Sequence, residues 1–395
     1  MKILLISPFF YPDKIGIALY NKLMLEYLLK KKHDVSVITA VPYYPEWKIK
    51  PPYDKTTLFG KEKYFGATVF RVKHYVPSRP TPFKRVLQIM HFTVLSFRYI
   101  FSVPKNSKII VVSPFTSSIL TALIIRFFRK GKIWCHIQDF EFDAGVETFK
   151  LKRFKKSLFK IESMLFNGCD CVSTVSNAML KKLGTKTTTQ RILFPNFINL
   201  ETFNESFSKH SHFQSNQKPQ LLYSGNIGEK QDWNFFTDFC KEVLDDIDIT
   251  IVGDGAMKNF VERELNRFDN IRFFDLVPYS ELPQLLCSFD GHILIQKKEV
   301  IDSVMPSKLI AMMLSGKPSF LYGNDLSESK TVADKSGGAF FYSGNNVKEF
   351  SFLVKKIILN KMQSKKIGDN ARKYASQNFS ENEILDRFEK NLQKL

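Results

Sequence analysis

The chain has 395 residues, of which 44% are apolar, 14% aromatic and 25% charged. This length favours two domains, and this composition excludes wholesale disorder and the collagen-like and low-complexity classes. The formal net charge is +19, and the excess lies in the first half, where residues 1–200 hold 33 Lys and Arg against 12 Asp and Glu. A one-sided basic field predicts an anionic partner, whether nucleic acid, an anionic bilayer or a phosphorylated substrate. The alternative is lysine that merely coats a soluble surface.

The cysteine pattern and the apolar segments indicate whether the chain is expected in the cytosol, outside the cell or in a membrane. The five cysteines form no C-x-x-C pair and are odd in number, which argues against a disulfide framework and a zinc site and fits a reducing cytosol. The first residues show no small-residue cleavage site, so we expect a strand there instead of a signal peptide. The break SPFTSS divides the most apolar stretch, residues 109–125, so we expect no transmembrane helix.

The first predicted elements form a βαβ unit. Apolar patterning predicts a strand at residues 3–7, a loop at 8–16, a helix that begins near Ile17, and a strand at 35–39. Further strand-like runs follow at residues 69–72, 108–113, 133–138 and 171–176. This alternation predicts an α/β domain with a parallel sheet.

A polar stretch, residues 199–219, interrupts the hydrophobic pattern and is the best linker candidate. A second α/β series follows, with strands expected at residues 221–225, 248–253, 271–275, 292–296 and 319–323. The predicted fold class is α/β, with two doubly wound, Rossmann-like parallel-sheet domains that face each other across a cleft. We place these domains at residues 1–200 and 201–380, and the amphipathic run 381–395 is able to pack back on the first domain.

Two segments of the second half carry residue types that hold a phosphate. In YSGNIGEK, two glycines, the first of them Gly225, follow a strand, and Lys230 comes shortly after them. Glycines allow close backbone approach and a lysine supplies charge. In MPSKLIAMMLSGKP, Pro306 stands where a helix begins, so the amides near Ser307 and Lys308 are free donors beside the Lys308 ammonium. A surface lysine on an ordinary capped helix is the alternative.

Two segments of the first half are also candidates. Gly16 directly precedes the first helix, but the G-x-G-x-x-G fingerprint is missing, which argues against a dehydrogenase. Gly16 is therefore either a point of ligand approach or an ordinary loop glycine. In HIQDFEFD, strand alternation puts His136 and Gln138 on one face and Asp139 on the other, near a strand's carboxyl end. Acid/base chemistry and a loop of solvated carboxylates both fit this pattern.

The basic excess is concentrated in residues 83–101 and 149–166, which mix Phe, Leu and Ile with Lys and Arg at helical spacing. Such helices either lie on an anionic membrane surface or pack on the core with a basic outer side. No nucleic-acid-binding module is recognisable. The acidic pair Asp246 and Asp248 precedes its strand instead of following one, so we assign no metal site.

Seven segments, taken in their order and spacing, point to one protein family. They are SPFFYPDKIG, HIQDFEFDA, FPNFIN, YSGNIGEKQ, IVGDGAMK, LVPYSELP and MPSKLIAMMLSGKP. With these segments, the chain resembles the retaining GT-B glycosyltransferases of glycosyltransferase family 4. It is similar to the bacterial branch that builds capsule, O-antigen and colanic-acid-type polysaccharides. The resemblance covers nearly the whole chain.

This resemblance implies a nucleotide sugar bound mainly by the second domain, an acceptor bound mainly by the first, and transfer with retention without a required metal. Carried over by position, it implies donor-binding roles for Gly16, Gly225, Asn226, Lys230, Val277, Pro306, Ser307 and Lys308. Gln138 and Asp139 match the family's His-Asp pair near the transferred sugar. Together with His136, they are the candidate catalytic residues.

The chain departs from the family pattern at three positions. Asn226 stands where Arg is usual, which removes one positive charge, and we expect Lys308 to supply it. The usual Glu-x7-Glu falls near Ser303 and Ala311, and neither is a carboxylate. Recognition of the ribose and of the sugar is therefore left to other residues.

These observations predict a glycosyltransferase of the cytoplasm, peripheral at the inner face of the cell membrane. We expect it to move a sugar from a UDP- or GDP-sugar to a polyprenyl-diphosphate-linked saccharide, with no cofactor and no nucleic-acid partner. One alternative is another GT-B enzyme, such as a nucleotide-sugar epimerase, which needs no lipid. The other is a non-enzymatic basic adaptor for membrane or nucleic acid, against which the two phosphate-binding segments argue.

Overall fold

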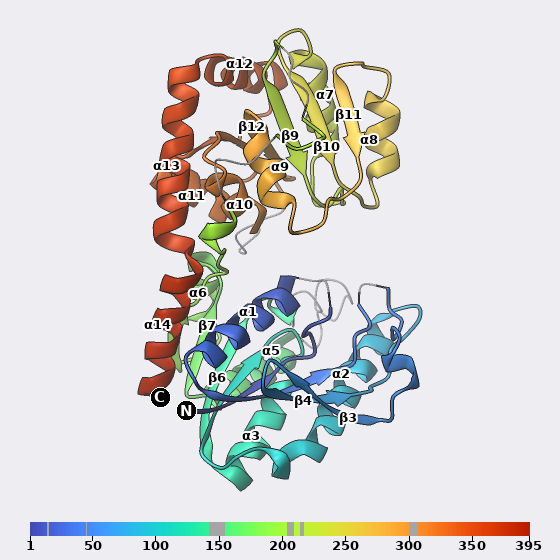
Figure 1. Cartoon of the computed structure of the whole chain (residues 1–395), viewed down its shortest axis with the longest axis vertical. Helices are drawn as coiled ribbons and strands as arrows, with labels where there is room; N and C mark the ends of the chain where they lie inside the picture. The colour runs from blue at the N-terminus through green and yellow to red at the C-terminus, as the bar shows by residue number, and fades with distance from the viewer. Residues whose placement is uncertain (14–15, 45, 142–154, 204–208, 214–216, 300–306) are drawn as a thin grey trace. The chain divides into compact units, whose positions relative to one another are not determined.

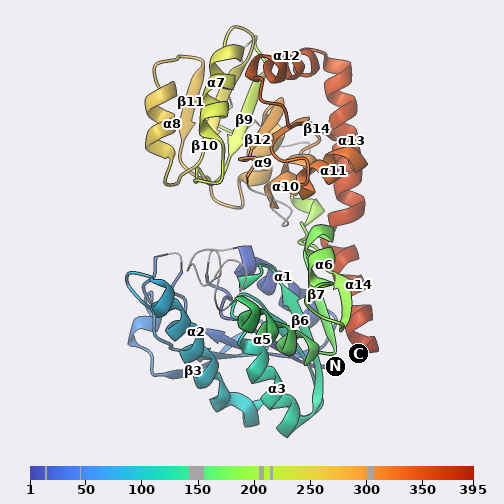
Figure 2. The same ribbon diagram turned by 180° about the vertical axis from the view of Figure 1, so that it is seen from behind.

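The computed structural model divides into two compact units, shown in Figures 1 and 2. The first unit is Met1–Asn196 with Ile384–Leu395, and the second is Phe197–Glu383. The structure describes residues 1–13, 16–44, 46–141, 155–203, 209–213, 217–299 and 307–395. None of the helices within these ranges is both long and apolar enough to cross a membrane.

The first unit is built on an eight-stranded sheet of order β3-β4-β2-β1-β5-β6-β7-β8. Every neighbouring pair is parallel except β3 and β4. The strands are β1 (Lys2–Ile6), β2 (Asp34–Ala40), β3 (Phe59–Tyr64), β4 (Ala67–Val72), β5 (Ser107–Val112), β6 (Gly131–Ile137), β7 (Cys171–Thr174) and β8 (Gln190–Leu193). Strands β1 and β2 are buried on both faces almost throughout, which explains their continuous apolar runs.

The helices of the first unit join these strands. They are α1 (Gly16–Lys30), α2 (Pro82–Ser96), α3 (Ser118–Arg129), α5 (Lys155–Asn167) and α6 (Asn177–Leu183), with the short 3-10 helices η1 (Tyr53–Lys55) and η2 (Phe97–Ser102). Helix α2 begins where the sequence gives a start signal, because Thr81 accepts a hydrogen bond from the Lys84 amide and Pro82 opens the first turn. The antiparallel strand β3 escaped the sequence analysis because its residues GKEKY lack an apolar run. Charged residues of this kind are typical of an edge strand.

The second unit is built on a six-stranded parallel sheet of order β11-β10-β9-β12-β13-β14. The strands are β9 (Gln220–Ser224), β10 (Asp248–Val252), β11 (Ile271–Phe274), β12 (Gly291–Ile295), β13 (Ser319–Tyr322) and β14 (Ala339–Tyr342). Alternate residues of one strand enter different cores: Leu221 and Tyr223 of β9 face one core, and Leu222 faces the other. The predicted class of two parallel-sheet α/β domains is thereby confirmed.

Seven described helices cover this second sheet. They are α7 (Trp233–Val243), α8 (Lys258–Leu265), α9 (Leu282–Ser288), α10 (Ser307–Leu314), α11 (Glu328–Ser336), α12 (Val347–Ile358) and α13 (Lys361–Phe379). The core beside Tyr223 includes residues of α7, α8 and α12, and the core beside Leu222 includes residues of α9, α10, α11 and α13. The sheet is therefore covered on both faces, as in a doubly wound fold.

The predicted linker, residues 199–219, does not lie at the boundary between the two units, so this expectation is wrong. The units divide between Asn196 and Phe197, before the stretch begins. The described parts of the stretch pack on the second unit. The buried His210 donates its backbone N–H to Ser288 Oγ at 2.8 Å, and the Phe213 ring lies 5.6 Å from that of Phe289. The sequence gave no sign that His210 and Phe213 would make these contacts, because both lie among polar residues.

The last helix, α14 (Glu381–Lys394), belongs to the first unit from Ile384 onward. Its Phe388 ring stacks on Phe194 at 4.6 Å and meets Trp134 edge-on at 4.9 Å. Its Asp386 accepts hydrogen bonds from Tyr27 of α1 and from Lys31, the residue that follows this helix. Both chain termini accordingly lie in one unit, close together in Figures 1 and 2.

Truncation of Phe388 tests this docking. Replacement by Ala removes a buried ring from between two aromatic partners, so we expect the Phe388→Ala variant to lose about 3 to 5 kcal/mol of unfolding free energy. The measurement is urea unfolding, followed by tryptophan fluorescence. The neighbouring, exposed Arg387 provides the control, because Arg387→Ala should change stability by no more than about 0.5 kcal/mol. Equal losses in the two variants would contradict the docking.

Candidate functional site

The order of strands reverses in the second unit between β9 and β12, which are adjacent at the centre of the sheet. In open parallel sheets, ligands bind at the carboxyl ends of the strands at such a reversal. The loop after β9 carries the predicted residues Gly225, Asn226 and Lys230, and helix α10, which follows β12, carries Lys308. The structure therefore brings these candidates to one edge of one sheet.

The Lys308 ammonium is the central feature of this edge. Its Nζ is buried, has no hydrogen-bond partner among the described residues and lies 5.4 Å from the centre of the Tyr223 ring. Burial lowers the pKa of Lys308 to about 8. A buried ammonium without an anion is unfavourable, so this geometry favours the arrival of a negatively charged ligand.

Gly225 is the residue that makes room for Lys308. Its φ is +123°, which favours glycine, and a Cβ at this position would overlap the Cε and Nζ of Lys308. The lysine side chain thus lies directly against the backbone at the end of β9. The glycine predicted to allow a ligand's approach also allows the approach of the lysine.

A second loop, after β10, holds the first one in place. The Gly225 N–H bonds to the Val252 carbonyl at 2.8 Å, and the Ile227 N–H bonds to the Asp254 carbonyl at 2.8 Å. A Cβ on Gly253 would overlap the Gly225 carbonyl. The segment IVGDG, which carried part of the family resemblance, is therefore needed for the packing of these two loops.

The other predicted donor residues of this unit occupy the surrounding edge. Asn226 and Lys230 are exposed, and the Lys230 carbonyl accepts the Lys297 N–H at 2.9 Å, which ties the loop to the end of β12. Val277 comes shortly after β11. It is half-buried and packs against the core beside Leu222. Ser307 begins α10, so its amide stands at the start of an eight-residue helix.

Three positions of the family pattern give no further evidence for the site. Pro306 and Ser303 lie outside the described residues. Ala311 lies in α10 on the side that is buried in the core. A carboxylate at this position would therefore be buried as well.

The catalytic candidates lie in the first unit, at the end of β6. His136 is buried, its Nδ1 lies 2.9 Å from Ser173 Oγ, and its Nε2 lies 2.9 Å from the Gln138 amide nitrogen. The same amide nitrogen donates to Asn196 Oδ1 at 3.1 Å. Because an amide nitrogen only donates, Nε2 of His136 accepts and its proton lies on Nδ1.

This network makes His136 a positioning residue. Burial lowers the pKa of His136 to about 3, so the imidazole stays neutral at physiological pH, and both ring nitrogens are already occupied. These contacts favour a positioning role over acid/base chemistry, and a catalytic role for His136 stays a prediction. Its hydrogen bonds orient the Gln138 side chain, and the next residue, Asp139, is exposed. Sequence reasoning gave no role to Ser173 or Asn196, which complete the network, although Asn196 lies in the segment FPNFIN that carried part of the resemblance.

Gly16 opens helix α1 and is exposed. The only atom near a Cβ built here is a ring carbon of Tyr20, at 3.9 Å, an ordinary contact. The fold of this unit thus gives no steric reason for glycine at this position. A role in ligand approach accordingly stays a prediction.

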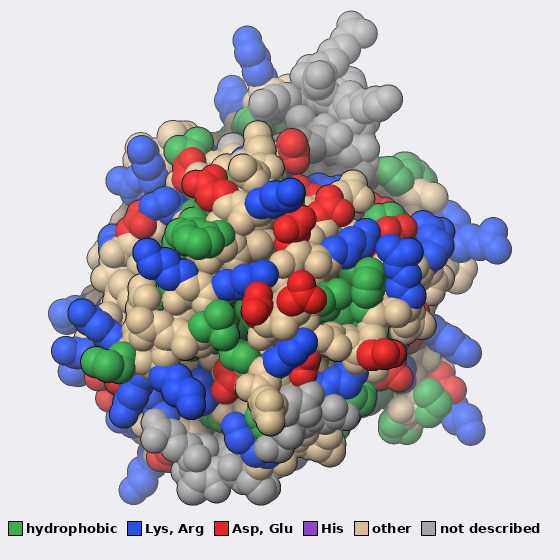
Figure 3. All heavy atoms as spheres, turned by 90° about the horizontal axis from the view of Figure 1, so that it is seen from above, with side chains coloured by type: hydrophobic (Ala, Val, Ile, Leu, Met, Phe, Trp, Pro, Cys, Tyr) green, Lys and Arg blue, Asp and Glu red, His purple; other side chains and the backbone are tan. Residues whose placement is uncertain are grey.

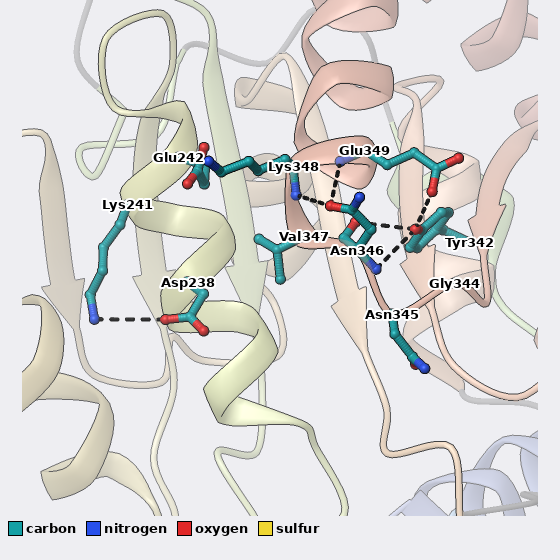
Figure 4. A pocket seen from close by; sticks show the side chains of 10 residues that line it. All are labelled: Asp238, Lys241, Glu242, Tyr342, Gly344, Asn345, Asn346, Val347, Lys348 and Glu349. Carbon is teal, nitrogen blue, oxygen red and sulfur yellow. Dashed lines mark hydrogen bonds and ion pairs between the residues drawn. The ribbon is translucent and has the colours of Figure 1, made fainter.

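A surface hollow between α7 and the start of α12 contains none of the candidates (Figure 4). Its side chains bond mainly to one another: Tyr342 donates to Glu349 at 2.6 Å, and Asn346 caps α12 by accepting the amides of Lys348 and Glu349. These bonds stabilise the start of α12 and occupy the polar groups that a ligand in the hollow would need. Within the described ranges, no three His, Cys, Asp or Glu side chains gather to hold a metal, and independence from metal stays a prediction.

Comparison with solved structures gives the fold. The sucrose-phosphate synthase of Thermosynechococcus elongatus matches with a TM-score of 0.72 and 14% identity, over 99% of this chain and 98% of that one. Anabaena Alr3699/HepE, solved in complex with UDP-glucose, matches with a TM-score of 0.66 and 13% identity over the full length of both chains. A trehalose-phosphate synthase from Burkholderia vietnamiensis matches with a TM-score of 0.71 and 10% identity, over 100% of this chain and 98% of that one.

Comparison of sequences gives the family. No family model matches the chain. A curated relative, the "Putative colanic acid biosynthesis glycosyl transferase WcaI" of Escherichia coli (strain K12), is 32% identical over 337 residues, which cover 80% of this chain and 82% of the relative. The chain belongs to the GT-B glycosyltransferases. This assignment confirms the family resemblance seen in the sequence and the predicted fold.

One substitution tests the geometry around Lys308 in this glycosyltransferase. Gly225→Ala should displace the Lys308 side chain, whose flexible end can shift at little cost in stability. We expect pyrophosphate affinity to fall by about ten-fold or more, because a charge-assisted contact is lost. The measurement is isothermal titration with inorganic pyrophosphate.

Gly66→Ala is the matched control for this substitution. Gly66 also has a positive φ, +95°, but its Cβ would meet nothing within 4 Å. Both variants should lose about 1 kcal/mol of stability from backbone strain, and only Gly225→Ala should lose affinity. Unchanged affinity in Gly225→Ala would contradict the role assigned to this contact.

Proposed function

We propose that this glycosyltransferase moves a sugar from a UDP- or GDP-sugar to a lipid-diphosphate-linked saccharide in bacterial surface polysaccharide biosynthesis. The observation that carries the donor half of the proposal is the buried Lys308 ammonium at the β9/β12 reversal, for which the described part of the chain supplies no hydrogen-bond partner. Two comparisons support it. The WcaI relative is named for colanic acid biosynthesis, and the HepE structure is titled as a complex with UDP-glucose.

The chemistry of the donor explains the charges of the site. When the bond between the anomeric carbon and the diphosphate oxygen breaks, negative charge develops on the departing diphosphate. Lys308, Lys230 and the amides at the start of α10 stabilise this charge, because fixed cations and helix-end donors act strongly where water is scarce. Lys308 thereby supplies the charge that Asn226 lacks, and the reaction needs no metal ion.

Transfer proceeds with retention in this proposal. The acceptor hydroxyl attacks the anomeric carbon from the face that the diphosphate leaves, and its proton passes to a departing diphosphate oxygen. Asp139 and the Gln138 amide orient the transferred sugar. His136 serves by holding Gln138, since its own nitrogens are engaged.

Removal of the Lys308 charge tests the donor site. Lys308→Met keeps most of the side chain and removes the ammonium, and we expect turnover to fall about 10²- to 10³-fold, as for the loss of one transition-state charge contact. The exposed Lys335→Met, in α11, is the control and should leave the rate unchanged. The measurement is release of nucleoside diphosphate with UDP- and GDP-sugars. If Lys308→Met has the same kinetics as wild type, the proposed role of Lys308 in stabilising the departing diphosphate is contradicted.

The pKa of Lys308 predicts a pH dependence of donor binding. The ammonium binds the diphosphate only when protonated, and its pKa in the free protein is about 8. Affinity for a nucleoside diphosphate should therefore be constant below about pH 8 and fall by about ten-fold per pH unit above it. Isothermal titration of wild type and Lys308→Met across this range measures the effect. A pH profile that is identical in the two proteins would contradict it.

A basic apolar face of the first unit suits a membrane surface. Residues 63–138 contain 13 Lys and Arg and no Asp or Glu. Within the first unit, α3 packs against α2, η2 and α5, and these elements expose large apolar side chains: Phe83, Val86, Leu87, Met90, Val94, Phe101, Leu120, Phe127, Phe128, Ile161 and Met164. By contrast, Figure 3, seen from the α12 end, shows basic and acidic side chains interspersed.

Apolar side chains amid excess positive charge favour binding to an anionic bilayer. The apolar side chains insert at the boundary of the acyl chains, and the basic residues attract the anionic headgroups. An acceptor anchored by a polyprenyl chain offers its diphosphate at such a surface. We therefore propose that the enzyme acts as a peripheral protein at the cytoplasmic face of the cell membrane.

Vesicle binding tests this face. The double variant Phe83→Ser/Phe127→Ser removes two of the most exposed rings, 78% and 81% accessible. We expect binding to phosphatidylglycerol vesicles in co-sedimentation to weaken at least about ten-fold, because each ring loses burial in the interface. Met362→Ser changes an equally exposed apolar side chain of the second unit and should bind as wild type. Equal binding by all three proteins would contradict the assignment.

A further inference from the structure

Tyr223, near the end of β9, contacts the donor edge in two different ways. Its ring is buried in the core that includes α7, and one face of the ring lies under the Nζ of Lys308 at 5.4 Å. Its hydroxyl lies 2.8 Å from the Asn226 carbonyl oxygen. A buried hydroxyl costs free energy unless it is hydrogen-bonded, and phenylalanine would fill the same space without that requirement. Tyrosine at this position therefore calls for a reason beyond packing.

The face of the ring offsets part of the cost of burying the Lys308 ammonium. The described residues offer this ammonium no hydrogen-bond acceptor and no carboxylate within ion-pair distance. An ammonium within about 6 Å of the centre of an aromatic ring is attracted to the negative face of the ring. A ring carries no net charge, so this contact holds the ammonium without neutralising it. Its positive charge stays available to an incoming anion.

Two other aromatic rings fix the orientation of Tyr223. The centre of the Trp233 ring lies 5.2 Å away with the planes at 69°, and that of Phe236 lies 5.5 Å away. Both residues belong to α7 and are buried. Because close-packed rings cannot turn independently, the face and the hydroxyl of Tyr223 are presented in fixed directions.

The hydroxyl of Tyr223 anchors the loop that follows β9. Burial raises the pKa of Tyr223, so the phenol keeps its proton and donates it to the Asn226 carbonyl. Two residues further along, Trp233 Nε1 donates to the Gly228 carbonyl at 2.6 Å. The Gly228 N–H in turn donates to Gln231 Oε1 at 3.1 Å. Donors from the aromatic core thus hold two carbonyls of this loop.

The two contacts of Tyr223 concern the same few atoms of the donor edge. Gly225 lies directly against the Lys308 ammonium, and Asn226, the next residue, is held by the Tyr223 hydroxyl. The side chain of Tyr223 therefore links the position of the cation to the position of the loop beside it.

We propose that Tyr223 is a positioning residue for the donor diphosphate, which holds the Lys308 ammonium over its ring and the Asn226 backbone by its hydroxyl. The purpose of this arrangement rests on the proposed donor site. The arrangement itself requires only that Lys308 and the loop depend on Tyr223.

An NMR titration of Lys308 in the ligand-free, full-length protein tests the role of the ring. The signal comes from isotope-labelled lysine and is assigned by its absence in Lys308→Met. Wild type should titrate at about pH 8. In Tyr223→Leu the midpoint should fall by about one pH unit, because the charged form loses its attraction to the ring. Tyr223→Met makes the same test with a side chain that fills more of the space, should the leucine variant not fold.

Tyr223→Phe tests the role of the hydroxyl separately. It keeps the ring, so the titration midpoint of Lys308 should equal that of wild type. Affinity for inorganic pyrophosphate, measured by isothermal titration, should fall about three- to ten-fold, because the Asn226 carbonyl loses its donor and the loop is held less well. Affinity equal to wild type would overturn the role of the hydroxyl.

Phe236→Leu is the matched control for loss of a ring from this core. Phe236 is 0% exposed and packs beside Tyr223 in the same cluster. Its loss should lower stability in urea unfolding, as in Tyr223→Leu, and leave the Lys308 midpoint unchanged. An unchanged or raised midpoint in Tyr223→Leu, or an equal fall in Phe236→Leu, would overturn the role of the ring.

The titration also separates this inference from the proposed function, because it needs no ligand. If the midpoint falls in Tyr223→Leu and wild type binds no nucleoside diphosphate, the donor proposal fails and the contact between Tyr223 and Lys308 stands. If wild type binds a nucleoside diphosphate and the midpoint does not fall, the donor proposal stands and the inference for Tyr223 is refuted.

Discussion

The Lys308 ammonium lies buried against the backbone of Gly225 at the reversal of the second sheet, and no residue that the structure describes accepts a hydrogen bond from it. Much of that edge depends on this contact. A glycine is required at the end of β9, a second glycine is required after β10 so that the two loops pack, and helix α10 must begin close by to deliver the lysine. In the proposed donor site, binding of the diphosphate would offset the cost of burying this charge.

Sequence reasoning reached the fold because apolar periodicity is local. It also found Gly225 and Lys308, because a glycine after a strand and a lysine at a helix start have a physical meaning in one dimension. It missed the edge strand β3, because the charged residues of this strand give no apolar run. It also predicted a linker at residues 199–219, where His210 packs on the second unit. It could not foresee that His136 is held between Ser173 and Gln138, because burial and hydrogen-bond partners arise only when distant segments meet.

The central claim is that the second unit binds the diphosphate of a nucleotide sugar. The most direct measurement is the shift in thermal unfolding midpoint of the purified protein with UDP, GDP and other nucleoside diphosphates, without added metal, because a ligand that binds only the folded state raises the midpoint. The account predicts a clear rise with UDP or GDP that is absent in Lys308→Met. No rise with any nucleotide at saturating concentrations would contradict it.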